Sequence, residues 1–246
     1  MHAVTSPEAA PDTAVPTLSD EVRHRLFVVI AAFNEAGAIA DVVRELRETC
    51  PNVVVVDDGS RDDTAAKASG AGAIVVRHPL NRGQGAALQT GITYALRQGA
   101  GFVVTFDADG QHRPQDIPGL VAPIARGEVD VCLGSRFLGR ADNMPTGRRL
   151  MLLGAVVFTR LTSGLKLTDA HNGLRAFSRR AAERLDLQLD RMAHASELVD
   201  QVRISGLPYR EVPVHIRYTD YSMAKGQRSS AAFRVAFDYL IGRLLR

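Results

Sequence analysis

Three short apolar runs, each followed by acidic side chains, constrain the fold of this chain more than any other feature. The runs cover residues 26–30, 53–56 and 102–106, and the acids that follow them are Glu35, Asp57, Asp58, Asp107 and Asp109. Runs of this length and β-branched content are typical of buried strands and are too short for ordinary helices. Because parallel strands end at the same edge of an open sheet, we expect these acids to gather where such sheets bind ligands.

The segments between the runs indicate a mostly parallel sheet flanked by helices. Apolar residues recur at helical spacing in residues 36–49 and 84–98, and further strands are predicted at residues 73–76 and 129–134. The second half predicts a helix around 150–158, a short strand after the polar loop that starts at residue 169, and a helix around 194–205. Residues 209–214 contain Pro213 and therefore favour an edge strand. The fold class is α/β, with one domain.

Composition narrows the class of protein. A chain of 246 residues with 46% apolar and 23% charged residues is globular and long enough for one large α/β domain. The net charge of +3 is mild, so anionic ligands or a membrane surface fit better than nucleic acid. Cys50 and Cys132 are far apart and show no metal-ligand or disulfide spacing, which favours the cytoplasm. Residues 1–24 are expected to form a flexible tail without a targeting core.

Asp107 and Asp109 are the best candidates for a metal site. Two carboxylates at positions i and i+2 after a strand suit a divalent cation that takes its remaining ligands from water and a substrate diphosphate. A surface turn is the alternative, because Asp and Gly are ordinary turn residues.

Other candidate residues also have structural interpretations that the sequence leaves open. Glu35, with Asn34, could cap the following helix. Gly83 and Gly85 could serve a tight loop rather than contact a phosphate. Arg175 could be a surface charge, and Glu197 could pair with an arginine. His112 and His171 are expected to be loop histidines rather than metal ligands.

Taken together, the motifs resemble glycosyltransferase family 2, and within it the dolichyl- or polyprenyl-phosphate mannosyl- and glucosyltransferases. The resemblance covers roughly residues 26–228. The matching stretches are 30–35, 56–60 with Asp63 and Thr64, 81–85, 107–112, 134–136, Asp169 with Gly173 and Arg175, Glu197, and 211–214.

The resemblance implies a GT-A fold over residues 25–228, with a nucleotide-sugar half and an acceptor half, followed by an amphipathic helix at 229–246. It implies inverting transfer of a sugar from a GDP-mannose- or UDP-glucose-type donor with Mn²⁺ or Mg²⁺. The implied nucleotide-sugar residues are Ala31, Ala32, Phe33, Glu35, Asp57, Asp58, Gly85, Asp107, Ala108, Lys225 and Arg228. The implied metal residues are Asp107, Asp109 and Gln111, and the implied catalytic residues are Asp109, Arg136, Arg175, Glu197 and Asp169.

The implied acceptor is a polyprenyl or dolichyl phosphate at the inner face of the membrane, and a homo-oligomer or a small membrane partner protein is left open. Two departures from the family pattern bear on this. Ala31 stands where the family usually has proline, and no transmembrane helices follow the catalytic residues. A saccharide or small-molecule hydroxyl as acceptor, and a catalytically silent nucleotide-sugar-binding scaffold, therefore remain alternatives. A dinucleotide-dependent oxidoreductase is disfavoured, because no G-x-G-x-x-G follows a strand.

Overall fold

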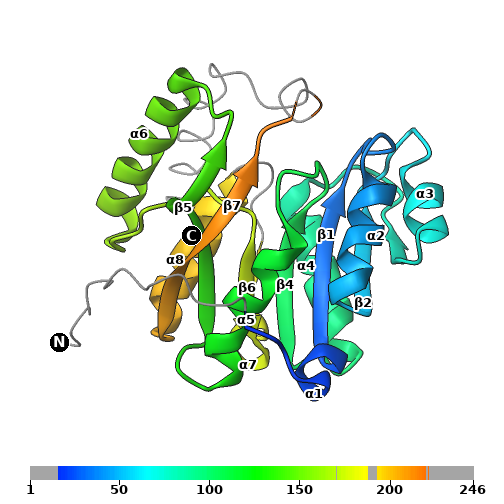
Figure 1. Ribbon diagram of the computed structural model, residues 1–246, viewed down its shortest axis with the longest axis horizontal. Coiled ribbons are helices and arrows are strands. Elements are labelled where there is room, and N and C mark those ends of the chain that lie inside the picture. The colour runs from blue at the N-terminus through cyan, green and yellow to red at the C-terminus, as the bar shows by residue number, and fades with distance from the viewer. Residues whose placement is uncertain (1–15, 170, 188–192, 220, 222–246) are drawn as a thin grey trace.

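A seven-stranded sheet in the order β3-β2-β1-β4-β6-β5-β7 forms the centre of the molecule (Figure 1). The computed structural model describes residues 16–169, 171–187, 193–219 and 221. The strands are β1 (Leu26–Ala32), β2 (Asn52–Asp57), β3 (Ile74–Arg77), β4 (Phe102–Asp107), β5 (Val131–Asp142), β6 (Arg175–Ser178) and β7 (Tyr209–Arg217). Neighbouring strands are parallel except at β6, which is antiparallel to both β4 and β5. The predicted mostly parallel α/β sheet is confirmed.

Helices cover both faces of this sheet. They are α1 (Asp20–His24), α2 (Ile39–Thr49), α3 (Thr64–Gly70), α4 (Gln84–Arg97), the 3₁₀ turn η1 (Pro114–Asp116), α5 (Ile117–Ala125), α6 (Thr146–Ser163), α7 (Arg179–Ala182) and α8 (Ala193–Ser205). Successive strand residues point to opposite faces. Val28 and Ile30 therefore pack with α2 and α5, whereas Val29 packs with α4 and α8.

Most predicted elements are present, and the differences lie in their bounds. β5 and β7 are longer than expected, because their pairing resumes after an irregularity and runs to Asp142 and Arg217. The sequence analysis missed α5, whose first turn contains Pro118, a position that tolerates proline, and whose interior contains Pro123, which argues against a helix in the sequence. β7 lies at the edge of the sheet, as its proline predicted.

The start of the chain is more ordered than predicted. The expected tail over residues 1–24 extends too far, because Asp20–His24 form α1 and Leu18 packs into the core. The Ser19 hydroxyl caps this helix by accepting the Val22 N–H, and the apolar Leu18 anchors the segment. The predicted helix at 229–246 lies outside the described residues.

Two further sequence-based expectations concern the cysteines and the membrane. Cys50 and Cys132 are free thiols in the core, and burial raises the pKa of each to about 12. None of the helices in the described part of the chain combines the length and apolar content needed to cross a bilayer.

Candidate active site

The acidic strand ends meet at one edge of the sheet, as predicted. In the pairing register, Ala32 at the end of β1 lies opposite Asp57 of β2, and Ala31 lies opposite Asp107 of β4. This edge is where open α/β sheets bind ligands. The residues implied for nucleotide binding and those implied for the metal therefore lie at or just after the ends of adjacent strands.

Asp107 and Asp109 lie together at this edge, and the pKa of Asp109 is strongly perturbed. Burial, and then the neighbouring charge of Asp107, raise the pKa of Asp109 to about 6. The Gln111 backbone N–H partly opposes this shift by donating to Asp109 Oδ1 at 3.0 Å. Asp107 Oδ2 lies 2.9 Å from His112 Nε2, and Asp107 Oδ1 accepts the Gln84 amide at 3.4 Å.

This donor set fits a divalent cation that is shared with a substrate. A carboxylate whose pKa is raised by a neighbouring carboxylate is stabilised in its charged form when a cation lies between the two. Gly173 keeps room beside them, because a Cβ there would lie 2.2 Å from Asp107 Oδ2. Within the described residues, no group of three or more His, Cys, Asp or Glu could hold a metal by itself. A bound cation would therefore need ligands from a diphosphate or water as well.

The segment after β1 is held by hydroxyl groups from the turn after β2. Asn34 N–H donates to Ser60 Oγ at 2.9 Å, and Glu35 N–H donates to Thr64 Oγ1 at 2.7 Å. The Glu35 carboxylate accepts the Tyr221 hydroxyl at 2.8 Å. The alternative that Asn34 or Glu35 caps the next helix is wrong, because α2 has Ala38 as its N-cap and no side-chain cap bond. Phe33 is exposed beside this segment.

Asp57 and Asp58 are both buried, but their partners differ. Asp57 accepts the Ser60 N–H at 3.0 Å and Arg77 Nε at 3.2 Å. Asp58 accepts the backbone N–H groups of Arg82 and Gly83, and it lies 2.7 Å from His78 Nδ1. Asp58 is thus bonded to the loop before α4.

The glycines of that loop differ from each other. Gly83 has a φ of 92°, a conformation in which glycine is favoured, so the tight-loop interpretation holds for this residue. Gly85 is buried inside α4.

Arg136 and Asp169 form a buried ion pair in the second half of the chain. Arg136 Nε lies 2.6 Å from Asp169 Oδ2, and Arg136 also donates to the Tyr218 hydroxyl at 2.8 Å and to the His171 carbonyl at 3.3 Å. Glu211 supports the pair from β7 by accepting the backbone N–H groups of Thr168 and Asp169. The predicted catalytic residues Arg136 and Asp169 are therefore brought together.

Arg175 is a buried cation of the site. Its residue surface is only 3% exposed, so the alternative of a surface charge is wrong. Burial lowers the pKa of Arg175 to about 10, while Asp107 and Asp169 oppose this shift. Arg175 therefore lies between the metal-side carboxylates and the buried Arg136–Asp169 pair.

The His171 ring is another polar group that is buried in this region. Its Nδ1 atom is buried without a hydrogen-bond partner among the described residues. Burial and the nearby charge of Arg175 lower the pKa of His171 to about 4, so its ring is neutral at pH 7. Glu197, the remaining predicted catalytic residue, is buried on α8. Lys225 and Arg228 lie outside the described residues.

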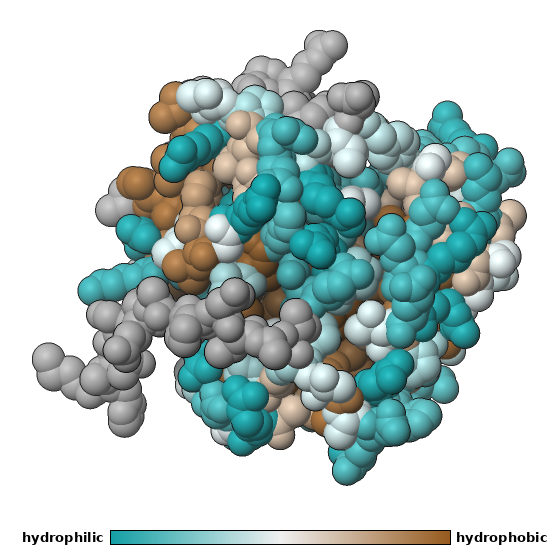
Figure 2. Space-filling view, in the orientation of Figure 1, coloured by the Kyte–Doolittle hydropathy of each residue, from teal (hydrophilic) through white to brown (hydrophobic). Residues whose placement is uncertain are grey.

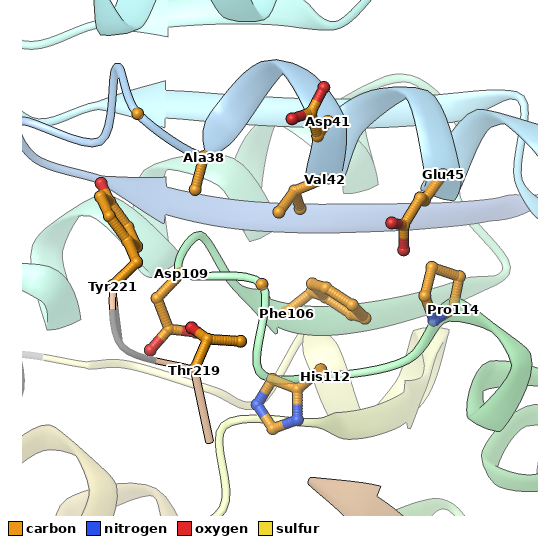
Figure 3. A pocket seen from close by; sticks show the side chains of 12 residues that line it. Ala38, Asp41, Val42, Glu45, Phe106, Asp109, His112, Pro114, Thr219 and Tyr221 are labelled. Atoms are coloured by element: carbon orange, nitrogen blue, oxygen red, sulfur yellow. The ribbon is translucent and has the colours of Figure 1, made fainter. Parts of the chain in front are cut away.

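A pocket of about 310 Å³ opens beside Asp109 (Figure 3). One side is formed by α2 and the other by the loop after β4, with Val42 and Phe106 facing each other between them. Thr219 and Tyr221 close the end nearest Asp109. The sequence analysis did not predict the roles of Gln84, His112 and Tyr221 at this edge. Gln84 and His112 stood inside the matching motifs, whereas nothing in the sequence shows that Tyr221 reaches Glu35.

The open sheet and its paired carboxylates define the class of the protein as a GT-A glycosyltransferase, and comparison with known proteins agrees. The profile of Glycosyl transferase family 2 matches residues 27–186. The chain belongs to this family, and it is a hexosyltransferase.

Two curated relatives and one solved structure illustrate the similarity. The UDP-N-acetylglucosamine–dolichyl-phosphate N-acetylglucosaminyltransferase of Methanococcus voltae is 34% identical over 88% of this chain and 95% of its own length. The polyprenol monophosphomannose synthase of Mycolicibacterium smegmatis is 30% identical over 96% of this chain and 92% of its own length. Glucosyl-3-phosphoglycerate synthase from Mycobacterium tuberculosis, solved with Mn²⁺ and UDP-glucose, has a TM-score of 0.71 at 22% identity. That similarity covers 95% of this chain and 84% of the other.

Proposed function

We propose that this protein transfers a sugar, with inversion, from a nucleotide-diphosphate donor to a polyprenyl phosphate. The observation that carries the proposal is the Arg175 side chain, which is only 3% exposed and lies within the electrostatic reach of Asp107 at the acidic edge of the sheet. A buried guanidinium has lost part of its hydration, so the site favours a ligand with anionic oxygens that can pair with it. Both the donor diphosphate and a lipid phosphate carry such oxygens. The relatives that act on lipid phosphates support the same assignment.

Asp107, Asp109 and Gln111 would hold Mn²⁺ or Mg²⁺ at the donor diphosphate. When bound, the cation would screen the negative charge that develops on the leaving phosphate. The neighbouring structure with Mn²⁺ and UDP-glucose supports the use of a divalent metal on this fold. Ala31, Ala32, Phe33, Glu35 and Asp57, at the ends of β1 and β2, would contact the base and ribose.

The state of Asp169 favours a phosphate acceptor over a hydroxyl acceptor. A hydroxyl acceptor needs a carboxylate base within hydrogen-bond reach, whereas a phosphate is already an anion at neutral pH. Asp169 is buried and paired with Arg136 at 2.6 Å, so it is committed to holding that arginine. Arg136 in turn would fix the loop that carries His171, and Arg175 would face the incoming phosphate.

A lipid acceptor requires contact with a membrane, and α6 offers a suitable surface. Leu150, Leu153 and Val157 lie on one side of this helix and are 66%, 41% and 55% exposed. Figure 2 shows hydrophobic surface over α6. The helix contains no acidic residue, and Arg149 and Arg160 are exposed beside the apolar side chains. Exposed apolar residues flanked by arginines are typical of helices that lie on anionic membranes.

Calorimetric titration of the purified protein with UDP and with GDP, each with and without Mn²⁺, tests the donor site. We expect one nucleotide to bind and its affinity to depend on Mn²⁺, because the two carboxylates alone are a poor site for a diphosphate. Binding of neither nucleotide in the presence of Mn²⁺ would contradict the proposal. Transfer of the matching labelled sugar to undecaprenyl phosphate, compared with a simple glycoside, then tests the acceptor.

A further inference from the structure

Both oxygens of the Asp58 carboxylate are bonded to protein groups, although Asp58 belongs to the acidic edge. Its Oδ1 accepts the Arg82 N–H at 2.9 Å and lies 2.7 Å from His78 Nδ1, while its Oδ2 accepts the Gly83 N–H at 2.8 Å. The side chains of His78 and Asp58 are 7% and 4% exposed. Asp58 therefore acts on the site through the loop that it holds.

His78 connects Asp58 to two other elements. Its Nε2 lies 3.0 Å from Thr90 Oγ1 on α4, and its backbone N–H donates to the Asp57 carbonyl at the end of β2. Through its ring and its backbone, His78 thus joins the segment after β3 to the end of β2 and to the second turn of α4. A buried side chain with a partner at both ring nitrogens has one stable orientation.

The loop that Asp58 holds leads directly to the donor-side carboxylates. Arg82 and Gly83 immediately precede α4, and Gln84, the first residue of that helix, donates to Asp107 at 3.4 Å. The turn after β2 packs closely on the same loop, since a Cβ at Gly59 would lie 2.7 Å from the Asn81 nitrogen. A displacement of Asp58 is therefore transmitted to Gln84 and to Asp107.

We infer that His78 is a positioning residue of the donor site. Through its hydrogen bond to Asp58, it fixes the loop at Arg82 and Gly83, and thereby the Gln84 amide on Asp107. The inference rests on the proposed function, because it takes Asp107 to serve the donor nucleotide and its cation. It adds a residue that touches neither of them.

Two substitutions separate the contacts of the two ring nitrogens. In His78→Asn the amide nitrogen branches from Cγ, as Nδ1 does, so it can still donate to Asp58. In His78→Gln the amide nitrogen reaches toward Thr90 and leaves Asp58 without this donor. Thr90→Val is the matched control, because it removes the other hydrogen bond of the ring and keeps the bond to Asp58. His78→Ser, which leaves room for water, is examined in the same way in case glutamine is not accommodated.

The readouts are the affinity for the nucleotide that the wild type binds, UDP or GDP with Mn²⁺, and the melting temperature. We expect His78→Gln and His78→Ser to weaken nucleotide binding about tenfold or more, because a loop that Asp58 no longer fixes must be ordered when the nucleotide binds. His78→Asn and Thr90→Val are expected to stay within about threefold of the wild type, even where they lower the melting temperature similarly.

Three results would contradict parts of this scheme. Unchanged affinity in His78→Gln and His78→Ser would overturn the inference and leave the proposed function intact. Equal losses in all four variants, in proportion to their melting temperatures, would show that His78 has a structural role only. A wild type that binds neither nucleotide with Mn²⁺ would overturn the proposed donor site, and the inference with it.

Discussion

At the scale of single residues, Asp109 is the group on which the metal assignment depends most. Asp109→Asn removes one of the two carboxylates and keeps the shape of the side chain. We expect turnover to fall by more than about tenfold, which corresponds to about 1.4 kcal/mol of transition-state free energy. The measurement is the initial rate of sugar transfer over a range of Mn²⁺ concentrations.

Asp41→Asn is the matched control for this substitution. Asp41 lines the same pocket from α2, but its side chain is largely exposed and, among the described residues, forms an ion pair only with Arg44. Its replacement should change turnover by less than about twofold, since surface ion pairs contribute little. If Asp109→Asn also stayed within that range, Asp109 would not be a metal ligand.

His171 should make the free energy of unfolding depend on pH. Burial lowers the pKa of His171 to about 4, so the unfolded chain takes up a proton between pH 6.5 and 4 while the native ring stays neutral. The stability that this ring contributes is therefore complete above pH 6.5 and is lost as the pH falls. Between pH 7 and pH 5, the free energy of unfolding of the wild type should fall about 1 to 2 kcal/mol more than that of His171→Gln. Urea denaturation at both pH values measures the difference, and parallel losses would contradict the assignment.

Sequence analysis located the charged residues of the site but not what each one contacts. Asp57, Asp107 and Asp109 follow strands, and their positions at the sheet edge follow from parallel pairing alone. The occupation of Asp58 by His78 could not be predicted in this way, because the two residues are twenty positions apart and meet only when β2 and β3 pair. The burial of Arg175 likewise depends on the antiparallel insertion of β6 between β4 and β5.

At the scale of elements, the position of α4 depends on a glycine. A Cβ at Gly91 would lie 2.3 Å from Val29 Cγ1 and 3.1 Å from Val56 Cγ2, so the helix approaches β1 and β2 more closely than alanine permits. Gly91→Ala should lower the free energy of unfolding by about 1 to 3 kcal/mol through overpacking, despite the better helix propensity of alanine. Urea denaturation measures this loss.

Gly154→Ala on α6 provides the opposite case. Apart from the surrounding turns of the helix itself, no atom of the described residues lies within 4 Å of a Cβ at this position, so helix propensity should decide the effect. The substitution should be neutral or stabilise the protein by up to about 1 kcal/mol. An equal effect of the two substitutions would show that the close approach of α4 does not limit the packing of the sheet.

The elements themselves were predicted wherever periodicity was clear. The buried strands and the helix at 84–98 follow from short apolar runs and helical spacing, and α4 ends within one residue of its prediction. α5 was missed because Pro123 in its interior lowers the helix propensity of the segment. The helix forms nevertheless, because Ile117, Leu120 and Val121 are buried against the sheet. Packing outweighed local propensity at this element.

At the scale of the whole molecule, the exposed apolar side of α6 predicts binding to anionic membranes. Leu150, Leu153 and Val157 would enter the interface while Arg149 and Arg160 contact the lipid phosphates. Replacing Leu150 and Val157 together by serine should weaken binding to vesicles of phosphatidylglycerol and phosphatidylcholine by about tenfold. The reason is the loss of two apolar side chains that would be partly buried in the lipid. Co-sedimentation at low and high salt measures this affinity, and binding of the wild type should fall as salt increases.

Ile204→Ser is the matched control for the α6 variant, because Ile204 is 73% exposed but lies on α8. It should leave vesicle binding unchanged. A double variant that binds vesicles as well as the wild type would remove α6 as the contact surface. If the same variant instead changed the oligomeric state in light scattering, the exposed side of α6 would be a subunit contact. A subunit contact would cover the side chains proposed to enter the lipid, so membrane binding and oligomerisation through α6 make opposite predictions for one pair of substitutions.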